Sequence, residues 1–399
     1  MPSLGKDFLL FTTRHEVLIG IFIQFVSSIF LAHGYDFRVS YVAGRNVAGG
    51  LSPYVGGFLE GVLSQGYGGY VQGIGETPLW PLYLGLVYLL SGGGVILFNV
   101  LMKIPIILAN IVFSYILYSR GNHGWRFFLF NPFVILTSAA WGKPDNIATL
   151  LIILGLISIE TPTRSAVVLS LATNLKPLTA AVMPSILSTL RYRQLNARVV
   201  FPATAVLSVV LFAASFMVFG WSLDTVVNGF GNWFIPAGGL SPFNVVELIY
   251  GVQRLPGDII VVGYVPVAAV LILAVVFLLK PPADMRELIL YSLVSAAVFF
   301  STRPWVSEQN ILLILGLTIL YTGREPPPPL WVIPLIFMFL NNSIQQQLYL
   351  IRPTIIEELH IIDSIVKPHR LLIRFITSII WYAVLWSLIY RLVRGGVKE

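Results

Sequence analysis

The chain has 399 residues, of which 56% are hydrophobic and only 11% are charged, and its mean hydropathy is +0.83. Soluble domains carry about 25% charged residues, so this composition excludes a soluble protein and predicts an integral membrane protein with many spans. The net charge of +7 does not indicate nucleic-acid binding, because the cytoplasmic loops of membrane proteins collect Lys and Arg. The chain has no cysteine, which excludes disulfides and thiol chemistry.

Membrane-length apolar segments recur along the whole chain, and no polar stretch between them is long enough to form a soluble domain. We therefore expect an all-α polytopic membrane protein of about 12 transmembrane helices, with residues 1–399 in a single domain. The expected segments are 15–33, 95–118, 126–141, 146–160, 164–175, 177–190, 199–220, 259–279, 287–301, 309–322, 329–345 and 372–393. Segment 78–91 is short and contains two prolines. We expect an interfacial or re-entrant helix over 78–94 instead of a full span.

The distribution of basic residues predicts the orientation in the membrane. If 78–91 does not span, the N-terminus, the basic loop RYRQLNAR at 191–198 and the C-terminus all lie on one side. The positive-inside rule makes that side cytoplasmic and makes the long first loop, 34–77, extracytoplasmic. Several cations and acids remain on the outer side with this loop. They predict a polar site at the outer membrane surface.

The stretch HGYDFRVSYVAGRNVAGGLSPY, at 33–54, places a carboxylate directly after the first apolar segment. Asp36 is either a solvated interface residue or a general base. We favour the general base, because a connection as long as 34–77 is unusual without a role. Arg38 is expected to lie close enough to keep Asp36 ionised.

Other candidates stand at or near the expected outer ends of spans. In WGKPDN, at 141–146, Trp141 is expected as an interfacial anchor, and Lys143 follows it. Asp145 in the same motif either caps the next helix or contacts a substrate. Lys103 and Lys176 interrupt apolar sequence, so each either marks a site or extends its ammonium to the interface.

The motif STRPWVSEQN, at 301–310, is the last candidate cluster. Its Arg303 would suit a phosphate, whereas Glu308 is either a helix N-terminal acid or a substrate contact. Arg352, His369 and Arg370 are weaker candidates for the same phosphate.

Residues 34–54 resemble the first extracytoplasmic loop of polyprenyl-phosphate-dependent glycosyltransferases of the C superfamily. The polyprenol-dependent mannosyltransferases of bacterial lipoglycan assembly have G-x-D-F, A-x-R and G-x-x-P-Y here, and the first mannosyltransferase of GPI-anchor assembly has a similar run ending in T-P-L. The matching residues are Gly34, Asp36, Phe37, Tyr41, Ala43, Arg45, Gly50, Ser52, Pro53, Tyr54, Thr77, Pro78 and Leu79. Further matches are Lys103, Asn131, Pro132, Gly142, Asp145, Lys176 and Gln309.

This resemblance implies a many-helix membrane fold with a partly helical first loop. It also implies transfer of a sugar, with mannose as the expected one, from a dolichyl- or undecaprenyl-type monophosphate to a lipid-linked or glycan acceptor hydroxyl outside the cytoplasm. Asp36 would be the general base. The residues predicted to bind substrate are Arg38, Arg45, Tyr54, Lys103, Lys143, Asp145, Lys176, Arg303, Glu308, Gln309, Arg352, His369 and Arg370.

The GPI branch has two aspartates separated by one residue, whereas this chain has Gly34 in place of the first. We therefore predict no cofactor, with a divalent metal as the open alternative. The expected partners are the polyprenyl-phosphate sugar, the acceptor and membrane lipids. No nucleic-acid partner is expected.

A competing hypothesis is a multi-pass transporter or flippase for a lipid-linked or anionic substrate. Transporters usually contain internal repeats and bind their substrate near the bilayer midplane. This chain shows no convincing repeat, and its polar residues concentrate on one side. A purely structural membrane subunit is a third possibility, which Lys103 and the outer charges disfavour.

Overall fold

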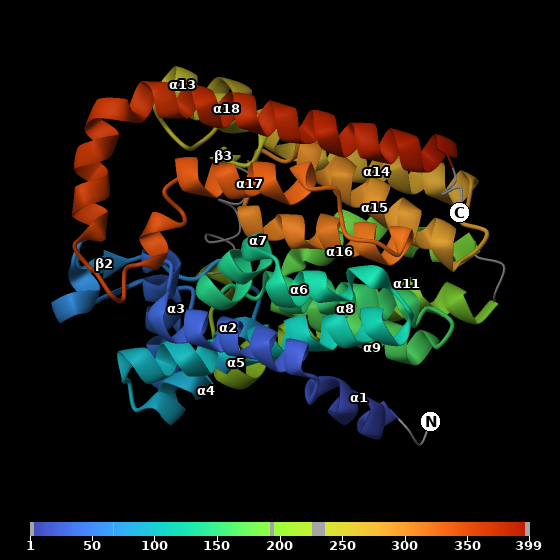
Figure 1. Cartoon of the computed structure of the whole chain (residues 1–399), viewed down its shortest axis with the longest axis horizontal. Coiled ribbons are helices and arrows are strands. Elements are labelled where there is room, and N and C mark those ends of the chain that lie inside the picture. The colour runs from blue at the N-terminus through green and yellow to red at the C-terminus, as the bar shows by residue number, and fades with distance from the viewer. Residues whose placement is uncertain (1–3, 67, 192–194, 226–235, 396–399) are drawn as a thin grey trace.

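The structure, a computed structural model, describes residues 4–66, 68–191, 195–225 and 236–395. Most of these residues are helical, and the axes of most helices are roughly aligned with one another, up or down the bundle (Figure 1). The helices are α1 (Leu4–Thr12), α2 (His15–Phe30), α3 (Gly34–Ala48), α4 (Leu79–Ser91), α5 (Val95–Ser119), α6 (Phe127–Phe130), α7 (Pro132–Ile135), α8 (Asp145–Ile157), α9 (Pro162–Leu175), α10 (Met183–Ser188), α11 (Val200–Phe219), α13 (Val245–Tyr250), α14 (Val265–Leu279), α15 (Met285–Thr302), α16 (Ile311–Thr322), α17 (Pro329–Leu340) and α18 (Ile355–Gly395).

Five described helices are long and apolar enough to cross a membrane: Val95–Ser119, Ala197–Phe219, Gly257–Leu279, Met285–Thr302 and Ile365–Gly395. A sixth span arises if Pro132–Ala140 and Asp145–Ile157, which meet at 108°, form one broken span. The shorter apolar helices are His15–Phe30, Leu79–Ser91, Glu308–Thr322 and Pro329–Leu340. These features fit the predicted all-α membrane protein, while helix length and composition do not show the predicted number of about twelve spans.

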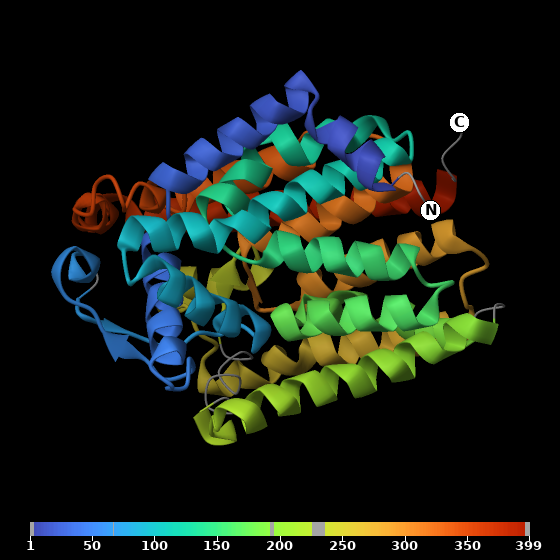
Figure 2. The same ribbon diagram turned by 90° about the horizontal axis from the view of Figure 1, so that it is seen from below.

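The two ends of the bundle differ in what they contain. Both chain termini lie at one end, and α3, α4 and strand β2 lie at the other (Figures 1 and 2). We call the end with α3 and β2 the site end. Residues 192–194 of the predicted cytoplasmic loop and the C-terminal residues 396–399 lie outside the described part of the chain.

The first loop, 34–77, is partly helical, as expected. It contains α3 and a short antiparallel pair of strands, β1 (Gly57–Phe58) and β2 (Tyr70–Val71). Helix α3 packs against α4, which follows the loop. A Cβ added to Gly44 of α3 would lie only 2.7 Å from the Leu84 carbonyl oxygen, so the two helices approach too closely for a larger residue there. This contact fixes α3 to the bundle.

Two chain breaks meet at the site end. Helix α2 ends at Phe30, and the extended residues after it are held in place because the Ala32 N–H donates to the Gln347 carbonyl at 2.8 Å. The second break follows a π-helical turn, Leu136–Ala140, and ends where α8 begins. A second short strand pair is parallel: β3 (Gly238–Gly239) pairs with β4 (Trp305–Val306). In the chain, β3 precedes α14 and β4 follows α15.

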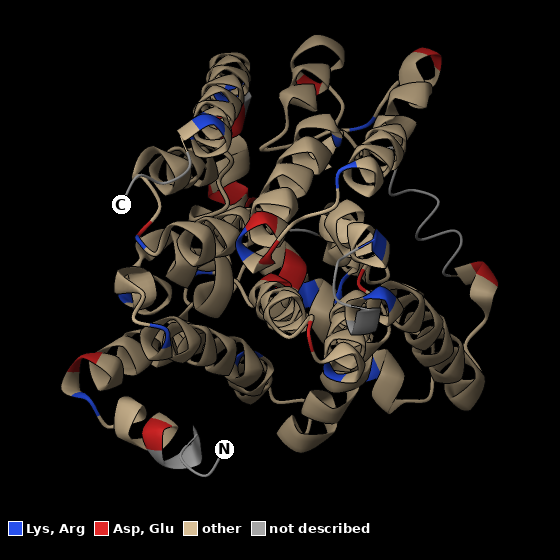
Figure 3. Cartoon of the chain, turned by 90° about the vertical axis from the view of Figure 1, so that its right-hand side faces the viewer, with Lys and Arg blue, Asp and Glu red and all other residues tan. Residues whose placement is uncertain are grey.

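The outer surface of the bundle is apolar, as lipid contact requires. Figure 3 looks at the end with the chain termini and shows helices with few charged positions. Helix α11 lies along one edge of the bundle (Figure 2). Its Val206, Val209 and Met217 are more than half exposed, at 62%, 68% and 82%. Such exposure suits a bilayer and would be unfavourable in water.

Candidate functional site

A cavity of about 1310 Å³ lies at the site end. Its walls come from the chain after α2, the end of the first loop, the break before α8, the chain between α15 and α16, the chain after α17, and α18. Pockets for one small ligand typically have about 300–1,000 Å³. The cavity therefore has room for more than one substrate group.

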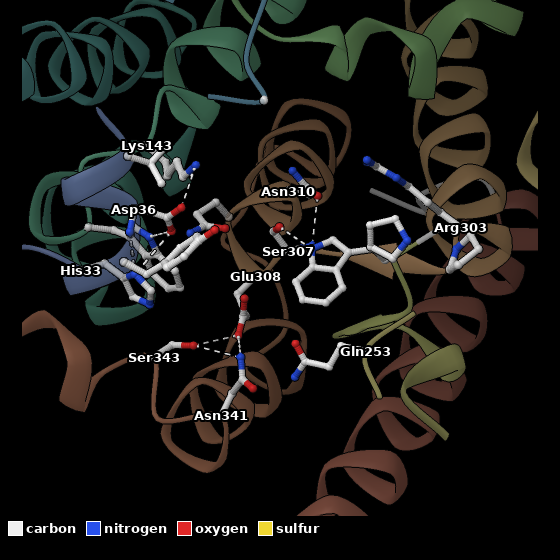
Figure 4. Close-up of a pocket in the computed structure, with 18 of the residues that line it drawn as sticks. His33, Asp36, Lys143, Gln253, Arg303, Ser307, Glu308, Asn310, Asn341 and Ser343 are labelled. Carbon is white, nitrogen blue, oxygen red and sulfur yellow. Dashed lines mark hydrogen bonds and ion pairs between the residues drawn. The ribbon is translucent and has the colours of Figure 1, made fainter. Parts of the chain in front are cut away.

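Asp36 lies in the first turn of α3, where the positive end of the helix dipole favours a carboxylate. His33 caps this helix, and its Nδ1 lies 3.4 Å from Asp36 Oδ2. The indole Nε1 of Trp141 donates to the same oxygen at 2.7 Å, and Lys143 Nζ lies 3.0 Å from Oδ1. The Asp36 side chain remains 20% exposed and lines the cavity (Figure 4).

These contacts determine the protonation states of Asp36 and His33. Burial acts to raise the pKa of Asp36, but the nearby Lys143 and the Trp141 hydrogen bond outweigh it and lower the pKa to about 2. Burial lowers the pKa of His33 to about 4, although Asp36 acts in the opposite direction. At neutral pH, Asp36 is therefore ionised and His33 is neutral.

Lys143 bridges two carboxylates. Its Nζ lies 3.0 Å from Asp36 Oδ1 and 2.7 Å from Glu76 Oε1. Glu76 is only 5% exposed, at the end of the first loop. One ammonium between two carboxylates leaves a net negative charge on this cluster, which suits a group that donates hydrogen bonds, such as a sugar hydroxyl.

The break before α8 positions Lys143. Gly142 has a φ of +90°, and a Cβ there would lie 2.6 Å from Met102 Cε and 2.9 Å from Lys103 Cε. The Trp141 ring stacks on His33, with ring centroids 4.2 Å apart and planes 4° apart. The positive φ favours glycine at 142, whereas the two neighbouring atoms are ends of flexible side chains on α5. Trp141, expected as a membrane anchor, is part of the site.

Lys103 is fully buried below this break and does not line the cavity. Its ammonium donates to the Leu31 carbonyl and, at 2.8 Å, to the Ala140 carbonyl. The Leu31 carbonyl directly follows α2, and the Ala140 carbonyl ends the π-helical turn. Carbonyls at helix C-termini lack helical partners and carry partial negative charge, so they favour a cation. The structure thus places Lys103 as a link between the two chain breaks and outside the cavity wall.

Lys176 lies at the turn between α9 and the 3₁₀ segment Pro177–Val182, as predicted, and lines the cavity. Its Nζ lies 2.6 Å from Asp145 Oδ2, and Asn310 Nδ2 donates to Asp145 Oδ1 at 2.7 Å. Asp145 is fully buried and does not line the cavity. It does not cap α8 with its side chain either. Its contacts hold Lys176 and Asn310 in the cavity wall.

Arg303, at the C-terminal end of α15, lines the opposite side of the cavity from Asp36 and Lys143 (Figure 4). Its guanidinium lies over the Phe299 ring at 5.6 Å. Within the described part of the chain, Arg303 forms no ion pair, in contrast to Lys143 and Lys176. Its charge is therefore available to an anion in the cavity.

Glu308 and Gln309 also line the cavity. Glu308 Oε1 accepts from Asn341 Nδ2 at 3.0 Å and from Ser343 Oγ at 3.1 Å. Glu308 is 4% exposed and forms no ion pair with the described residues, so these hydrogen bonds satisfy one of its oxygens.

The remaining predicted residues of the first loop do not line the cavity. Arg38 Nε donates to the Leu63 carbonyl at 2.6 Å, and its Nη2 donates to Gly68. Arg45 Nη1 donates to the Phe58 carbonyl at 2.9 Å. These arginines fold the loop over α3, and Lys143, not Arg38, is the cation at Asp36.

Tyr54, Arg352 and His369 also lie outside the cavity wall. The Tyr54 ring packs on Phe216 of α11, with centroids 5.7 Å apart. Arg352 pairs with Glu358 at 2.8 Å near the start of α18, and His369 is exposed. Arg370, by contrast, lines the cavity and pairs with Asp363.

His33, Glu76 and Arg374 also line the cavity. Sequence reasoning placed Glu76 and Arg374 among the charges of the outer face but selected none of the three as a site residue. Glu76 immediately precedes the Thr77-Pro78-Leu79 motif, and that position was an available signal. In the described residues, no group of three or more His, Asp or Glu side chains is placed to hold a metal ion. No known protein-family model matches the sequence, and no curated protein matches it significantly.

Proposed function

We propose that this protein is a membrane glycosyltransferase. It transfers a sugar, with mannose as the expected one, from a polyprenyl monophosphate to a hydroxyl of a lipid-linked or glycan acceptor on the extracytoplasmic side. The supporting observation is an ionised, partly exposed Asp36 in a large cavity, lined by both charged and apolar side chains, at one end of an apolar helical bundle.

Asp36 is suited to the role of general base. A sugar hydroxyl is a very weak acid, so its proton must leave as the hydroxyl oxygen attacks the anomeric carbon of the donor. In this step the new C–O bond forms, the bond from the anomeric carbon to the phosphate oxygen breaks with its electron pair, and Asp36 takes the hydroxyl proton. Lys143 is a positioning residue, because it holds Asp36 ionised and fixed.

The leaving phosphate gains negative charge in the transition state and needs fixed cations. Lys176 and Arg303 line the cavity, and the guanidinium of Arg303 has no ion-pair partner in the described chain. We assign the donor phosphate to these two residues. Lys103, which was predicted to join them, instead donates its ammonium hydrogens to the backbone carbonyls of Ser28, Leu31 and Ala140.

An apolar groove supports this placement of the donor. It has a volume of about 610 Å³, lies between α9 and α11, and is lined by Phe212, Phe216 and Met217 among others. Pro177, which follows Lys176, lines both the groove and the cavity. A polyprenyl tail in the groove would place its phosphate beside Lys176, since the two hollows adjoin there.

The test uses purified protein in lipid with radiolabelled polyprenyl-phosphate sugars and a membrane lipid extract as the acceptor source. We expect label to move from at least one donor to an acceptor. Asp36→Asn keeps the size of the side chain but cannot take the proton, so turnover should fall roughly 10²-fold or more while donor affinity and thermal stability persist.

Asp258→Asn is the matched control, because Asp258 is exposed and lies outside the cavity. It should transfer at the wild-type rate. Near-normal transfer by Asp36→Asn would remove Asp36 as the base. Donor movement across the membrane without any label on an acceptor would favour the flippase hypothesis instead.

A further inference from the structure

One face of α18 lines the cavity over several turns. Leu359, Asp363, Arg370 and Arg374 all contribute to the wall and recur at helical spacing. Pro368 lies inside this helix, and Figure 1 shows the helix bending where it passes from the site end along the bundle. A proline removes a helical hydrogen bond and permits such a bend. Residues on both sides of Pro368, including Asp363 and Arg370, line the cavity.

Arg374 is 2% exposed, and some of its hydrogen-bond donors are unused within the described part of the chain. Its Nη1 donates to Glu247 Oε2 at 3.1 Å, and the same oxygen accepts from Gln253 Nε2 at 2.9 Å. Its Nε and Nη2 have no partner among the described residues. A buried guanidinium with two unmet N–H groups is costly unless a ligand completes it.

Arg370 repeats this arrangement one turn earlier on the same face. It pairs with Asp363, which also accepts from Asn342 Nδ2 at 3.0 Å. The Nε of Arg370 is buried and unpartnered within the described ranges. The two neighbouring guanidiniums on the cavity wall thus have three nitrogens whose N–H groups find no acceptor among the described residues. Guanidinium groups bind phosphate oxygens through parallel N–H bonds.

We infer that Arg370 and Arg374 form a second anion site in the cavity, which binds the phosphodiester of a lipid headgroup. Asp363 and Glu247 already balance the two guanidinium charges, and the nearby cavity wall adds one cation, Lys367, and one acid, Glu308. A singly charged phosphodiester therefore fits better than a doubly charged monoester. Its assignment as the headgroup of the acceptor rests on the proposed glycosyltransferase function.

The location separates this site from the one assigned to the donor. None of the described residues of α18 lines the apolar groove beside Lys176. On its other face, the first part of α18 exposes Ile361, Ile362 and Ile365 at 66%, 52% and 75%. An apolar outer face suits a helix that lies at the membrane surface. A lipid headgroup would pass beneath this helix into the cavity while its acyl chains stay in the bilayer.

The binding test uses the full protein in dodecyl maltoside micelles. Native mass spectrometry and thermal shift are measured with phosphatidylglycerol, with diacylglycerol of the same chains, and with inorganic phosphate alone. We expect phosphatidylglycerol to bind and stabilise the protein, and diacylglycerol to have little effect. Equal effects of the two lipids would overturn the anion site. Stabilisation by inorganic phosphate as strong as by the lipid would overturn the headgroup assignment.

The variants are Arg370→Gln and the charge-matched pair Arg374→Gln with Glu247→Gln, which leaves no unpaired buried charge. Each should weaken phosphatidylglycerol binding about tenfold or more, the effect expected from losing a charge-assisted contact. Arg352→Gln, an exposed arginine outside the cavity, is the control and should bind normally. Wild-type affinity for phosphatidylglycerol in both test variants would contradict the inference.

Asp36→Asn separates this inference from the proposed function. It should bind phosphatidylglycerol as the wild type does, because Asp36 is not part of the arginine site. Arginine-dependent lipid binding in a protein that transfers no sugar would refute the glycosyltransferase and leave the anion site intact. Sugar transfer without arginine-dependent lipid binding would refute only the anion site.

Discussion

At the scale of single residues, the balance between burial and Lys143 determines the charge on Asp36. Burial alone would raise the pKa of this carboxyl, and the ammonium 3.0 Å away reverses the shift. The same ammonium serves Glu76 at 2.7 Å. Removal of Lys143 would leave two nearby carboxylates without a cation, so at least one of them would bind a proton more readily.

We therefore predict a change in the pH profile of Lys143→Gln. In the wild type, Asp36 stays ionised down to a pH of about 2, so it does not limit transfer between pH 5 and 8. In the variant, the acid limb of the rate profile should move upward by about one pH unit or more. The measurement is transfer rate against pH, with Lys280→Gln, outside the cavity, as the control. Superimposable profiles would show that Lys143 does not tune the base.

His33 provides a second residue-scale prediction, which concerns stability. Its pKa is about 4 in the folded protein and about 6.5 when unfolded, so between these values only the unfolded state gains a proton. Stability should therefore fall as pH drops from about 6.5 to about 4, by about 3 kcal/mol in total. His33 is 7% exposed, so solvent screening is slight.

His33→Asn should flatten this dependence, since asparagine can still cap α3 but does not titrate. Thermal stability at pH 4.5 and pH 7 checks the expectation. His369→Asn, at an exposed position, is the control and should keep the wild-type slope. An unchanged slope in His33→Asn would assign the pH dependence to other groups.

At the scale of elements, the site depends on two chain breaks that Lys103 joins. Its ammonium bonds the carbonyls of Leu31 and Ala140, so it sets the distance between the start of α3 and the Trp141–Lys143 turn. Lys103→Met should leave these buried carbonyls without their donor. We expect a loss of about 1–3 kcal/mol in the free energy of unfolding, with reduced transfer because the turn shifts.

The comparison is Leu108→Met, a lipid-facing position on the same helix that is 51% exposed. Its stability and activity should match the wild type. Unfolding and donor affinity are measured on the same preparations. If Lys103→Met kept full stability and lost donor affinity alone, Lys103 would instead be a phosphate ligand, as its sequence context first indicated.

The elements also show what the sequence could and could not predict. Segment 95–118 was expected as a span, and α5 covers Val95–Ser119. A helix is predictable there because a long apolar run in a bilayer must pair its backbone N–H and C=O groups within the segment. The π-helical turn at Leu136–Ala140 had no such signal, since the same apolar residues also fit a regular helix. The contacts of Lys103 depend on this turn and were therefore not predictable.

The same limit applies to the site. Asp36 could be selected from the sequence because it opens a connection, 34–77, that is long for a segment without a role. Its cation could not, since Arg38 is near in sequence but residues two apart on a helix do not share a face. Lys143 reaches Asp36 only through the folding of distant segments.

At the scale of the whole molecule, the cavity, the first loop and the apolar groove lie where a membrane-bound donor would need them. A tail in the groove beside Lys176 would hold its phosphate near headgroup depth, and Asp36 lines the adjoining cavity. The carboxylate after the first apolar helix is then explained by chemistry at the membrane surface. This explanation requires the site end to face out of the cytoplasm.

We predict that orientation, with the N-terminus, the 191–198 loop and the C-terminus inside and the 34–77 loop outside. Because the chain has no cysteine, single cysteines report position without background. Glu60→Cys lies exposed in the first loop, whereas Arg120→Cys and Gly395→Cys lie exposed in the turn after α5 and at the end of α18. In intact cells, a membrane-impermeant maleimide should label Glu60→Cys alone, and permeabilised cells should show labelling of all three. Labelling of Gly395→Cys in intact cells, with Glu60→Cys protected, would invert the orientation and place Asp36 on the cytoplasmic side, where the proposed extracytoplasmic transfer could not occur.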